Sequence, residues 1–220
     1  MLSTRAKWFG LVCVLAVAMS SAAAHALDLL TDFPENQGEK DLYALYYESG
    51  TFTQMQDVST KSRWFSKTGT DTGYPYLRAR PNDVLFHPGP SSYSVLEYRP
   101  SLAGSYSFEL RFWNGGGGPG CTTRALVFVN DSIGSPLAQG DVSAANTVST
   151  PLVLSGNVTL SATDLLRIAV DPKNGYSYDA TLATGWITKN LDPAPEPGSV
   201  LAVAVGLVGM LSGLRRRATR

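Results

Sequence analysis

The chain has 220 residues, which is long enough to bury the core of one domain or of two small ones. Its 44% hydrophobic and 16% charged residues are globular proportions, which excludes disorder along the whole chain. The formal net charge is zero, but six basic residues lie at the two ends; residues 27–197 therefore carry eighteen acids and twelve bases, which argues against a nucleic-acid-binding protein.

Residues 1–26 have the three parts of a secretory signal peptide. Arg5 and Lys7 are followed by the apolar run 8–19, and the segment ends in Ala24 and Ala26 on either side of His25. This A-x-A pattern predicts cleavage after Ala26 and export of a mature chain that begins at residue 27. The alternative is an uncleaved membrane anchor, although the apolar run is shorter than the ~20 residues that a spanning helix usually needs.

Residues 27–191 alternate between short apolar runs and clusters of Gly, Pro, Asn and Asp, without a helical period. The clearest strand is predicted over residues 105–114, where Tyr106, Phe108, Leu110 and Phe112 fall on one face. Further strands are predicted at 84–86, 94–98, 124–129, 151–154, 157–160, 165–170 and 184–188, with turns at 130–134, 155–157 and 171–175. Many short strands predict an all-β fold, a two-sheet jelly-roll-like sandwich.

Several short motifs in this segment follow one another in the order in which they occur in a bacterial β-sandwich family. They are Asp32-Phe33, Gln37-Gly38, Tyr43 to Tyr47, Phe52-Thr53, Trp64, His87-Pro88-Gly89, Pro100-Ser101-Leu102-Ala103-Gly104, Val129-Asn130, Thr163-Asp164, Val170-Asp171-Pro172 and Tyr178-Asp179-Ala180-Thr181. On these motifs the chain resembles a carbohydrate-binding-module-like domain. The resemblance implies a non-catalytic β-sandwich of extracellular, polysaccharide-associated proteins. Where that family has an arginine–tryptophan pair, this chain has Glu97-Tyr98.

Aromatic side chains are the candidates for glycan binding, because sugars stack their apolar C–H faces on exposed rings. We select Trp64, Tyr74, Tyr76 and Trp113, since Trp113 lies opposite the predicted core row and the two tyrosines flank Pro75 in a turn. The alternative for each is packing within or between the sheets. Burial of three or more of the four would argue against a sugar site.

A structural calcium ion is the second binding hypothesis, and no other cofactor is predicted. The first and last strands of a jelly roll often lie side by side, which would bring Asp32 near Asp171 or Asp179. Ca²⁺ prefers clustered carboxylate and carbonyl oxygens. The alternative is that these aspartates lie in turns and accept hydrogen bonds from their own backbone.

The inventory of reactive side chains argues against most enzyme classes. Outside the signal peptide, His87 is the only histidine and Cys121 the only cysteine, which leaves too few ligands for a His-based zinc site and excludes an intramolecular disulfide. Residues 115–120 contain G-x-G-x-x-G, but they lead into a predicted strand instead of a helix. We predict no catalytic residues; the alternative, an extracellular carbohydrate-active enzyme, needs two close carboxylates in a cleft.

The C-terminal region has three parts in a fixed order. Residues 192–197 form a proline-rich linker with Pro195, Glu196 and Pro197, residues 198–214 carry no charge, and residues 215–220 form a basic tail with Arg215, Arg216 and Arg217. The uncharged part predicts a transmembrane helix of about 25 Å. With the amino end exported, the arginines would stay in the cytoplasm.

These three parts resemble the PEP-CTERM sorting signal of Gram-negative bacteria. The resemblance implies an exosortase as partner, anchoring in the inner membrane before processing, and then deployment at the cell surface or in the extracellular matrix. The alternative is an ordinary single-pass membrane protein. The sequence thus predicts an exported, surface-sorted, non-catalytic protein that associates with exopolysaccharide or other matrix, and it leaves open a purely structural protein without a ligand.

Overall fold

The computed structural model describes residues 26–59, 61–116, 122–173 and 179–190. Most of the predicted signal peptide, the Pro195-Glu196-Pro197 motif, the predicted transmembrane segment, the arginine tail and Cys121 lie outside these residues. Within the described part of the chain, no helical segment has the length and hydropathy of a membrane span. The described residues all belong to one unit, His25–Asn190, which is considered below by itself.

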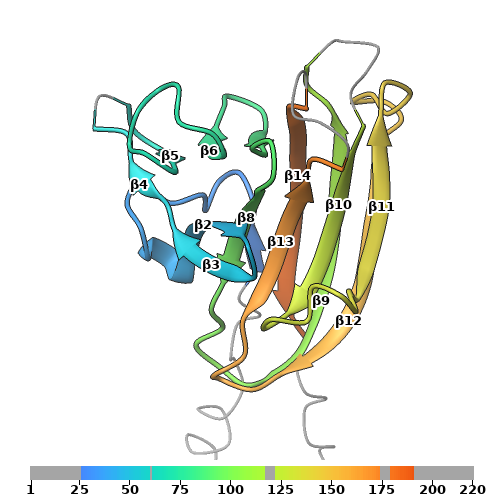
Figure 1. The fold of residues 1–220 in the computed structure, drawn as a ribbon. Coiled ribbons are helices and arrows are strands. Elements are labelled where there is room, and N and C mark those ends of the chain that lie inside the picture. The colour runs from blue at the N-terminus through green and yellow to red at the C-terminus, as the bar shows by residue number, and fades with distance from the viewer. Residues whose placement is uncertain (1–25, 60, 117–121, 174–178, 191–220) are drawn as a thin grey trace, which may run out of the picture. The chain divides into compact units, whose positions relative to one another are not determined.

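The described residues form two antiparallel β-sheets, which confirms the predicted all-β, two-sheet architecture (Figure 1). The eight-stranded sheet has the order β12-β9-β14-β7-β6-β5-β4, and β1 pairs with β14. Its strands are β1 (Ala26–Asp28), β4 (Gln56–Asp57), β5 (Trp64–Ser66), β6 (Tyr76–Ala79), β7 (Val84–His87), β9 (Gly104–Asn114), β12 (Leu152–Leu160) and β14 (Thr181–Lys189).

The six-stranded sheet has the order β11-β10-β13-β8-β2-β3. Its strands are β2 (Leu42–Glu48), β3 (Thr51–Gln54), β8 (Tyr93–Tyr98), β10 (Thr122–Val129), β11 (Ala138–Ser143) and β13 (Leu166–Asp171). A short 3-10 turn, Glu39–Asp41, precedes β2.

The core lies between the two sheets, because side chains alternate between the faces of each strand. Phe108, Leu110 and Phe112 of β9 are at most 2% exposed and form the predicted inward row. Val127 of β10 and Ile168 of β13 belong to the same core from the other sheet. Burial of this apolar surface, at about 25 cal/mol per Å², is the main stabilising contribution to the fold.

The predicted turn at residues 155–157 is wrong. The two strands that were expected on either side of it form one strand, β12, which pairs with β9 throughout and places Gly156 opposite Phe108. Pairing with the long neighbour overrides the local turn preference of Ser-Gly-Asn. Gly156 instead makes room for its partner, since a Cβ atom there would lie 3.0 Å from the Phe108 ring.

The first and last strands lie side by side, as expected of a jelly roll. Strand β1 is antiparallel to β14, with Leu27 opposite Ile187. The predicted strands at 84–86, 94–98, 105–114, 124–129, 165–170 and 184–188 are all present, most of them extended by one or more residues. Strands β1 to β6 and β11 were not predicted, because most of them are short and lack a clear alternation.

Candidate functional site

Each sheet carries a second hydrophobic cluster on its outer face. On the six-stranded sheet this cluster contains Leu126 and Phe128, which flank the inward-facing Val127. On the eight-stranded sheet it contains Trp113 and Leu182, which pair directly with each other across β9 and β14. Both outer faces therefore offer apolar surface beyond the core.

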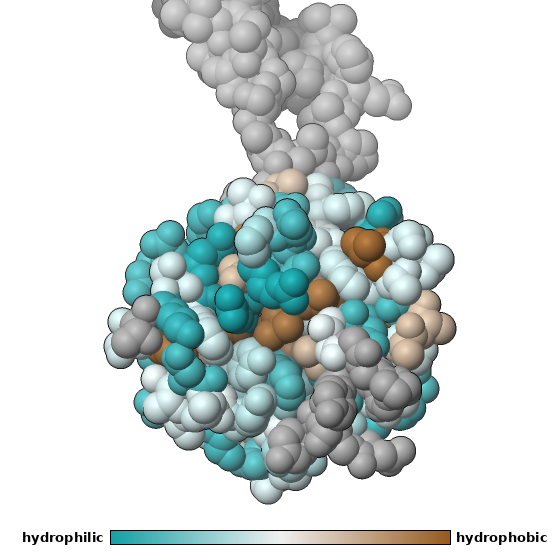
Figure 2. Space-filling view, turned by 90° about the horizontal axis from the view of Figure 1, so that it is seen from above, coloured by the Kyte–Doolittle hydropathy of each residue, from teal (hydrophilic) through white to brown (hydrophobic). Residues whose placement is uncertain are grey.

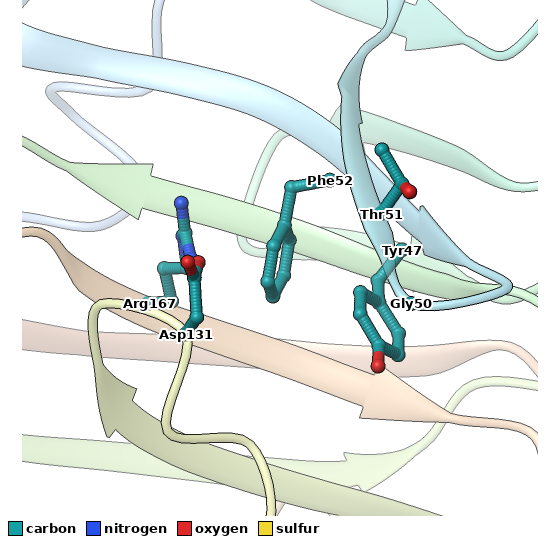
Figure 3. A pocket seen from close by; sticks show the side chains of 6 residues that line it. All are labelled: Tyr47, Gly50, Thr51, Phe52, Asp131 and Arg167. Atoms are coloured by element: carbon teal, nitrogen blue, oxygen red, sulfur yellow. The ribbon is translucent and has the colours of Figure 1, made fainter.

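A pocket of about 350 Å³ opens on the outer face of the six-stranded sheet (Figure 3). Its lining residues are Tyr47, Gly50, Thr51, Phe52, Asp131 and Arg167. The pocket lies at the lower end of the size range of ligand sites, which is roughly 300–1,000 Å³. Its residues come from the β2–β3 hairpin, from the turn after β10 and from β13.

The hairpin turn sets the aromatic wall of the pocket. Ser49 and Gly50 both have a positive φ, at 51° and 85°, which lets the chain reverse within two residues. Tyr47 and Phe52 then face each other across the two strands, with their ring centroids 4.7 Å apart. Tyr93 packs edge-on against Tyr47 at 5.4 Å, so the wall is supported from the next strand.

The polar wall of the pocket is an arginine fixed by two carboxylates. Arg167 donates from Nε to Glu97 at 2.8 Å and from Nη1 to Asp131 and to the Asn130 carbonyl at 2.5 Å each. Its guanidinium carbon lies 3.8 Å from the centre of the Phe52 ring. In Figure 3 the Arg167–Asp131 pair lies on one side of Phe52, and Tyr47 lies on the other.

These three charged side chains differ in their exposure. The side chains of Glu97 and Arg167 are 1% and 6% exposed, whereas that of Asp131 is 83% exposed. Glu97 also accepts from Arg99 at 2.7 Å. Glu97 thus supplies the buried carboxylate that holds Arg167.

The four aromatic residues selected from the sequence lie together on the outer face of the eight-stranded sheet. Tyr76 packs against Trp64 at 5.6 Å and against Tyr74 at 5.4 Å between ring centroids. Trp113 belongs to the hydrophobic cluster against which Tyr76 packs. The structure therefore brings together residues that are up to 49 positions apart in the sequence.

Burial divides these four residues into two pairs. Trp64 and Trp113 are 7% and 8% exposed, Tyr76 is half-buried, and Tyr74 is 41% exposed. Cationic groups of Lys61 and Arg78 lie 4.5 and 4.7 Å from the centre of the Trp64 ring, which is close enough for cation–π contacts. The indoles thus pack into the surface, and the tyrosines alone keep ring area for a sugar.

His87 belongs to the same aromatic group. Its ring stacks on Tyr76 at 5.0 Å and lies 4.6 Å from Tyr74, and Nδ1 donates to the Pro88 carbonyl at 2.9 Å. Burial lowers the pKa of His87, so the imidazole is neutral near pH 7. This arrangement fits a structural role for the histidine.

The three aspartates of the calcium hypothesis do not form a metal site. Among the described residues, no group of three or more His, Cys, Asp and Glu side chains has the arrangement to hold a metal ion. Asp32 accepts from the backbone N–H of Asp28 at 2.8 Å and pairs with Lys40 at 2.9 Å, at the end of β14 that contacts β1. Asp179 precedes the opposite end of that strand, about 23 Å along it from the residue paired with Asp28.

Asp171 and Asp179 have local roles of their own. Asp171 accepts from the backbone N–H of Lys173 at 2.9 Å, which is the turn geometry that was the alternative to a calcium site. Asp179 is 2% exposed, and burial raises the pKa of its carboxyl group. Residues 174–178 between them are outside the described part of the chain.

Sequence reasoning missed the pocket and one exposed indole. Trp186 of β14 is 39% exposed but was not selected, although it lies within a predicted strand. Tyr47 and Phe52 were noted only as members of family-like motifs. The signal in the sequence that could have predicted the pocket wall was the short turn Ser49-Gly50 between the aromatic residues Tyr47 and Phe52.

Large apolar side chains are scattered over the surface of the described module. Those that are exposed are Tyr74, Leu102, Leu137, Val148, Val153 and Trp186. Figure 2 shows the end of the module seen from above, where small hydrophobic patches are separated by hydrophilic residues.

No protein-family model and no curated protein match the chain. Similar solved structures include a family 35 carbohydrate binding module from an environmental isolate, at 20% identity over 49% of this chain and 77% of that one, with a TM-score of 0.32. Others are the C-terminal CBM6 of LamC, a marine laminarinase from Zobellia galactanivorans (14% identity, 66% and 99% coverage, TM-score 0.34), and CBM51 from Clostridium perfringens GH95 in complex with methyl-galactose (9% identity, 75% and 100% coverage, TM-score 0.36). At these TM-scores and identities, the likeness supports no conclusion about a ligand or an activity.

Proposed function

We propose that this chain is an exported, non-catalytic protein whose β-sandwich binds a glycan in the pocket on the outer face of the six-stranded sheet. The observation that carries the proposal is the pairing of an aromatic wall, Tyr47 and Phe52, with a fixed polar wall, Arg167 and Asp131. A sugar ring has apolar C–H faces and a rim of hydroxyl groups. Aromatic rings can stack on the apolar faces, and charged planar groups such as guanidinium and carboxylate can form hydrogen bonds with the hydroxyl groups.

The polar groups have hydrogen-bonding capacity left for hydroxyls. Among the described residues, Arg167 donates hydrogen bonds from Nε and Nη1. Asp131 and Thr51 add an exposed carboxylate and a hydroxyl. Because the Arg167 side chain is already held in place, a ligand loses little affinity to ordering it.

Binding is favoured over catalysis by the composition of the pocket. Asp131 is the one carboxylate among the lining residues, and Glu97 lies behind the guanidinium of Arg167. Glycoside hydrolysis usually needs two carboxyl groups that flank the scissile bond. Release of new reducing ends from any glycan that binds would support the enzyme alternative.

The proposal includes sorting to the cell surface, with exopolysaccharide or another matrix glycan as the ligand. Its support is the signal-peptide pattern at residues 1–26 and the three-part C-terminal pattern at residues 192–220. Replacing Pro195, Glu196 and Pro197 by alanine should leave the chain in the inner membrane. Unchanged delivery to the surface would remove the exosortase from the proposal.

The binding test uses the full-length chain and a panel of neutral and acidic glycans, including bacterial exopolysaccharide. Phe52→Ala and Tyr47→Ala should each weaken binding about tenfold, because a stacked ring contributes on the order of 1 kcal/mol beyond the area that it buries. Tyr74→Ala and Trp186→Ala, on the other sheet, are the matched controls and should bind like the unmodified chain. Thermal unfolding of each variant separates lost binding from lost structure.

Two outcomes would contradict this assignment. If Tyr74→Ala abolished binding while the two pocket variants bound normally, the site would be the tyrosine pair predicted from the sequence. If no glycan bound at all, a structural role without a ligand would be the better description.

A further inference from the structure

We propose that the pocket selects glycans without acidic groups, an inference that rests on the proposed glycan-binding function. The reason is the way in which charge is distributed in the pocket. Two charged residues line it, Asp131 and Arg167, and they differ greatly in their access to a ligand.

The guanidinium of Arg167 does not act as an open receptor for anions. It is 6% exposed, one flank is occupied by Glu97 at 2.8 Å, and Asp131 lies at 2.5 Å from Nη1. Both carboxylates that contact Arg167 are thus already paired, and Glu97 also pairs with Arg99. A carboxylate or a sulfate from a ligand would meet a guanidinium that is already paired and would lie close to the exposed carboxylate of Asp131.

The exposed charge at the pocket is negative. The Asp131 side chain is 83% exposed and accepts from Arg167 through Oδ1, which leaves Oδ2 for a hydroxyl donor. A sugar hydroxyl can donate to this oxygen, whereas an ionised acidic group has no hydrogen to donate and is repelled by the Asp131 carboxylate.

Other cations on this side of the sheet are paired as well, Arg99 with Glu97 at 2.7 Å. Arg124 and Lys173 both pair with Asp141, at 3.3 and 2.8 Å. Burial and the carboxylate of Asp171 both raise the pKa of Tyr93, which packs against Tyr47. Residues 26–190 together contain sixteen acids and twelve bases, so the long-range field also disfavours anionic chains.

The test compares a neutral polysaccharide with its carboxylated counterpart, galactan against polygalacturonate, using the full-length chain at low salt. We expect the neutral polymer to bind at least about tenfold more tightly, and we expect added salt to narrow this ratio as the Debye length shrinks to ~8 Å at 0.15 M. Asp131→Asn removes the charge but keeps an acceptor for Arg167. It should raise the affinity for the acidic polymer about tenfold relative to the affinity for the neutral one.

Asp71→Asn is the matched control, because Asp71 is also exposed and pairs with Lys61, and neither residue lines the pocket. It should leave the ratio of affinities unchanged. If the acidic polymer binds as tightly as the neutral one, or if Asp131→Asn does not alter the ratio of affinities while Phe52→Ala still weakens binding, the selectivity is overturned and glycan binding stands. Failure of both polymers and of the remaining glycan panel overturns the proposed function and this inference with it.

Discussion

Glu97 and Arg167 form a buried ion pair, so substitutions of these two residues should have non-additive effects on the free energy of unfolding. Loss of one partner from a buried pair costs about 3–5 kcal/mol, because it leaves a desolvated charge without compensation. Arg167 would retain Asp131, and Glu97 would retain Arg99, so we expect the lower end of this range, about 3 kcal/mol, for Glu97→Met and somewhat less for Arg167→Met. For a module of this size, that corresponds to a fall in Tm of roughly 6–12 °C.

The double variant Glu97→Met/Arg167→Met should recover most of this loss, because it leaves neither charge buried. We expect its stability within ~1–2 kcal/mol of the unmodified chain in chemical denaturation near pH 7. The exposed pair Glu109–Arg111, at 2.8 Å, is the matched control, and Glu109→Met should cost less than ~1 kcal/mol. A double variant that is destabilised by the sum of the two single variants would show no coupling and would refute the reasoning.

Two further predictions concern the eight-stranded sheet. Gly185 has a φ of 142°, and a Cβ atom there would lie 2.2 Å from the backbone oxygen of Glu109, so Gly185→Ala should cost about 3 kcal/mol or more in chemical denaturation. Gly134→Ala, where nothing lies within 4 Å, should change stability by less than ~0.5 kcal/mol, and equal losses in the two variants would contradict the steric argument. Burial places the pKa of His87 below its usual value, so the unfolded chain takes up the proton first and stability should fall as the pH drops through about 6.5. The His87→Gln variant should not show this fall in stability. Curves of Tm against pH that run parallel for the variant and the unmodified chain would contradict the assignment to His87.

The strand pattern was the most predictable part of the molecule. The alternation of Tyr106, Phe108, Leu110 and Phe112 predicted both the strand and its inward face, and all four side chains are buried in the core. Residues 155–157 show the limit of this reasoning. Their turn preference is a local property, whereas the pairing with β9 that overrides it is a long-range contact.

The candidate site was less predictable for the same reason. Trp113 was placed correctly on the outer face of β9, but its neighbours Leu85 and Leu182, which help to bury it, come from two other strands. The aspartates of the calcium hypothesis were expected to meet because the first and last strands pair, and those strands do pair. The register of this pairing places Asp32 near the C-terminal end of β14, whereas Asp179 precedes its N-terminal end.

The sequence by itself determined the strands that have a clear alternation, such as residues 105–114, and which of their side chains point inward, because this pattern depends on neighbouring residues. Only the tertiary structure decided which outward-facing residues meet, because sheet order and register are fixed by the packing of the whole module. The pocket is the clearest case: Tyr47 and Phe52 lie five positions apart, but Arg167 joins them only because β13 and β2 both pair with β8.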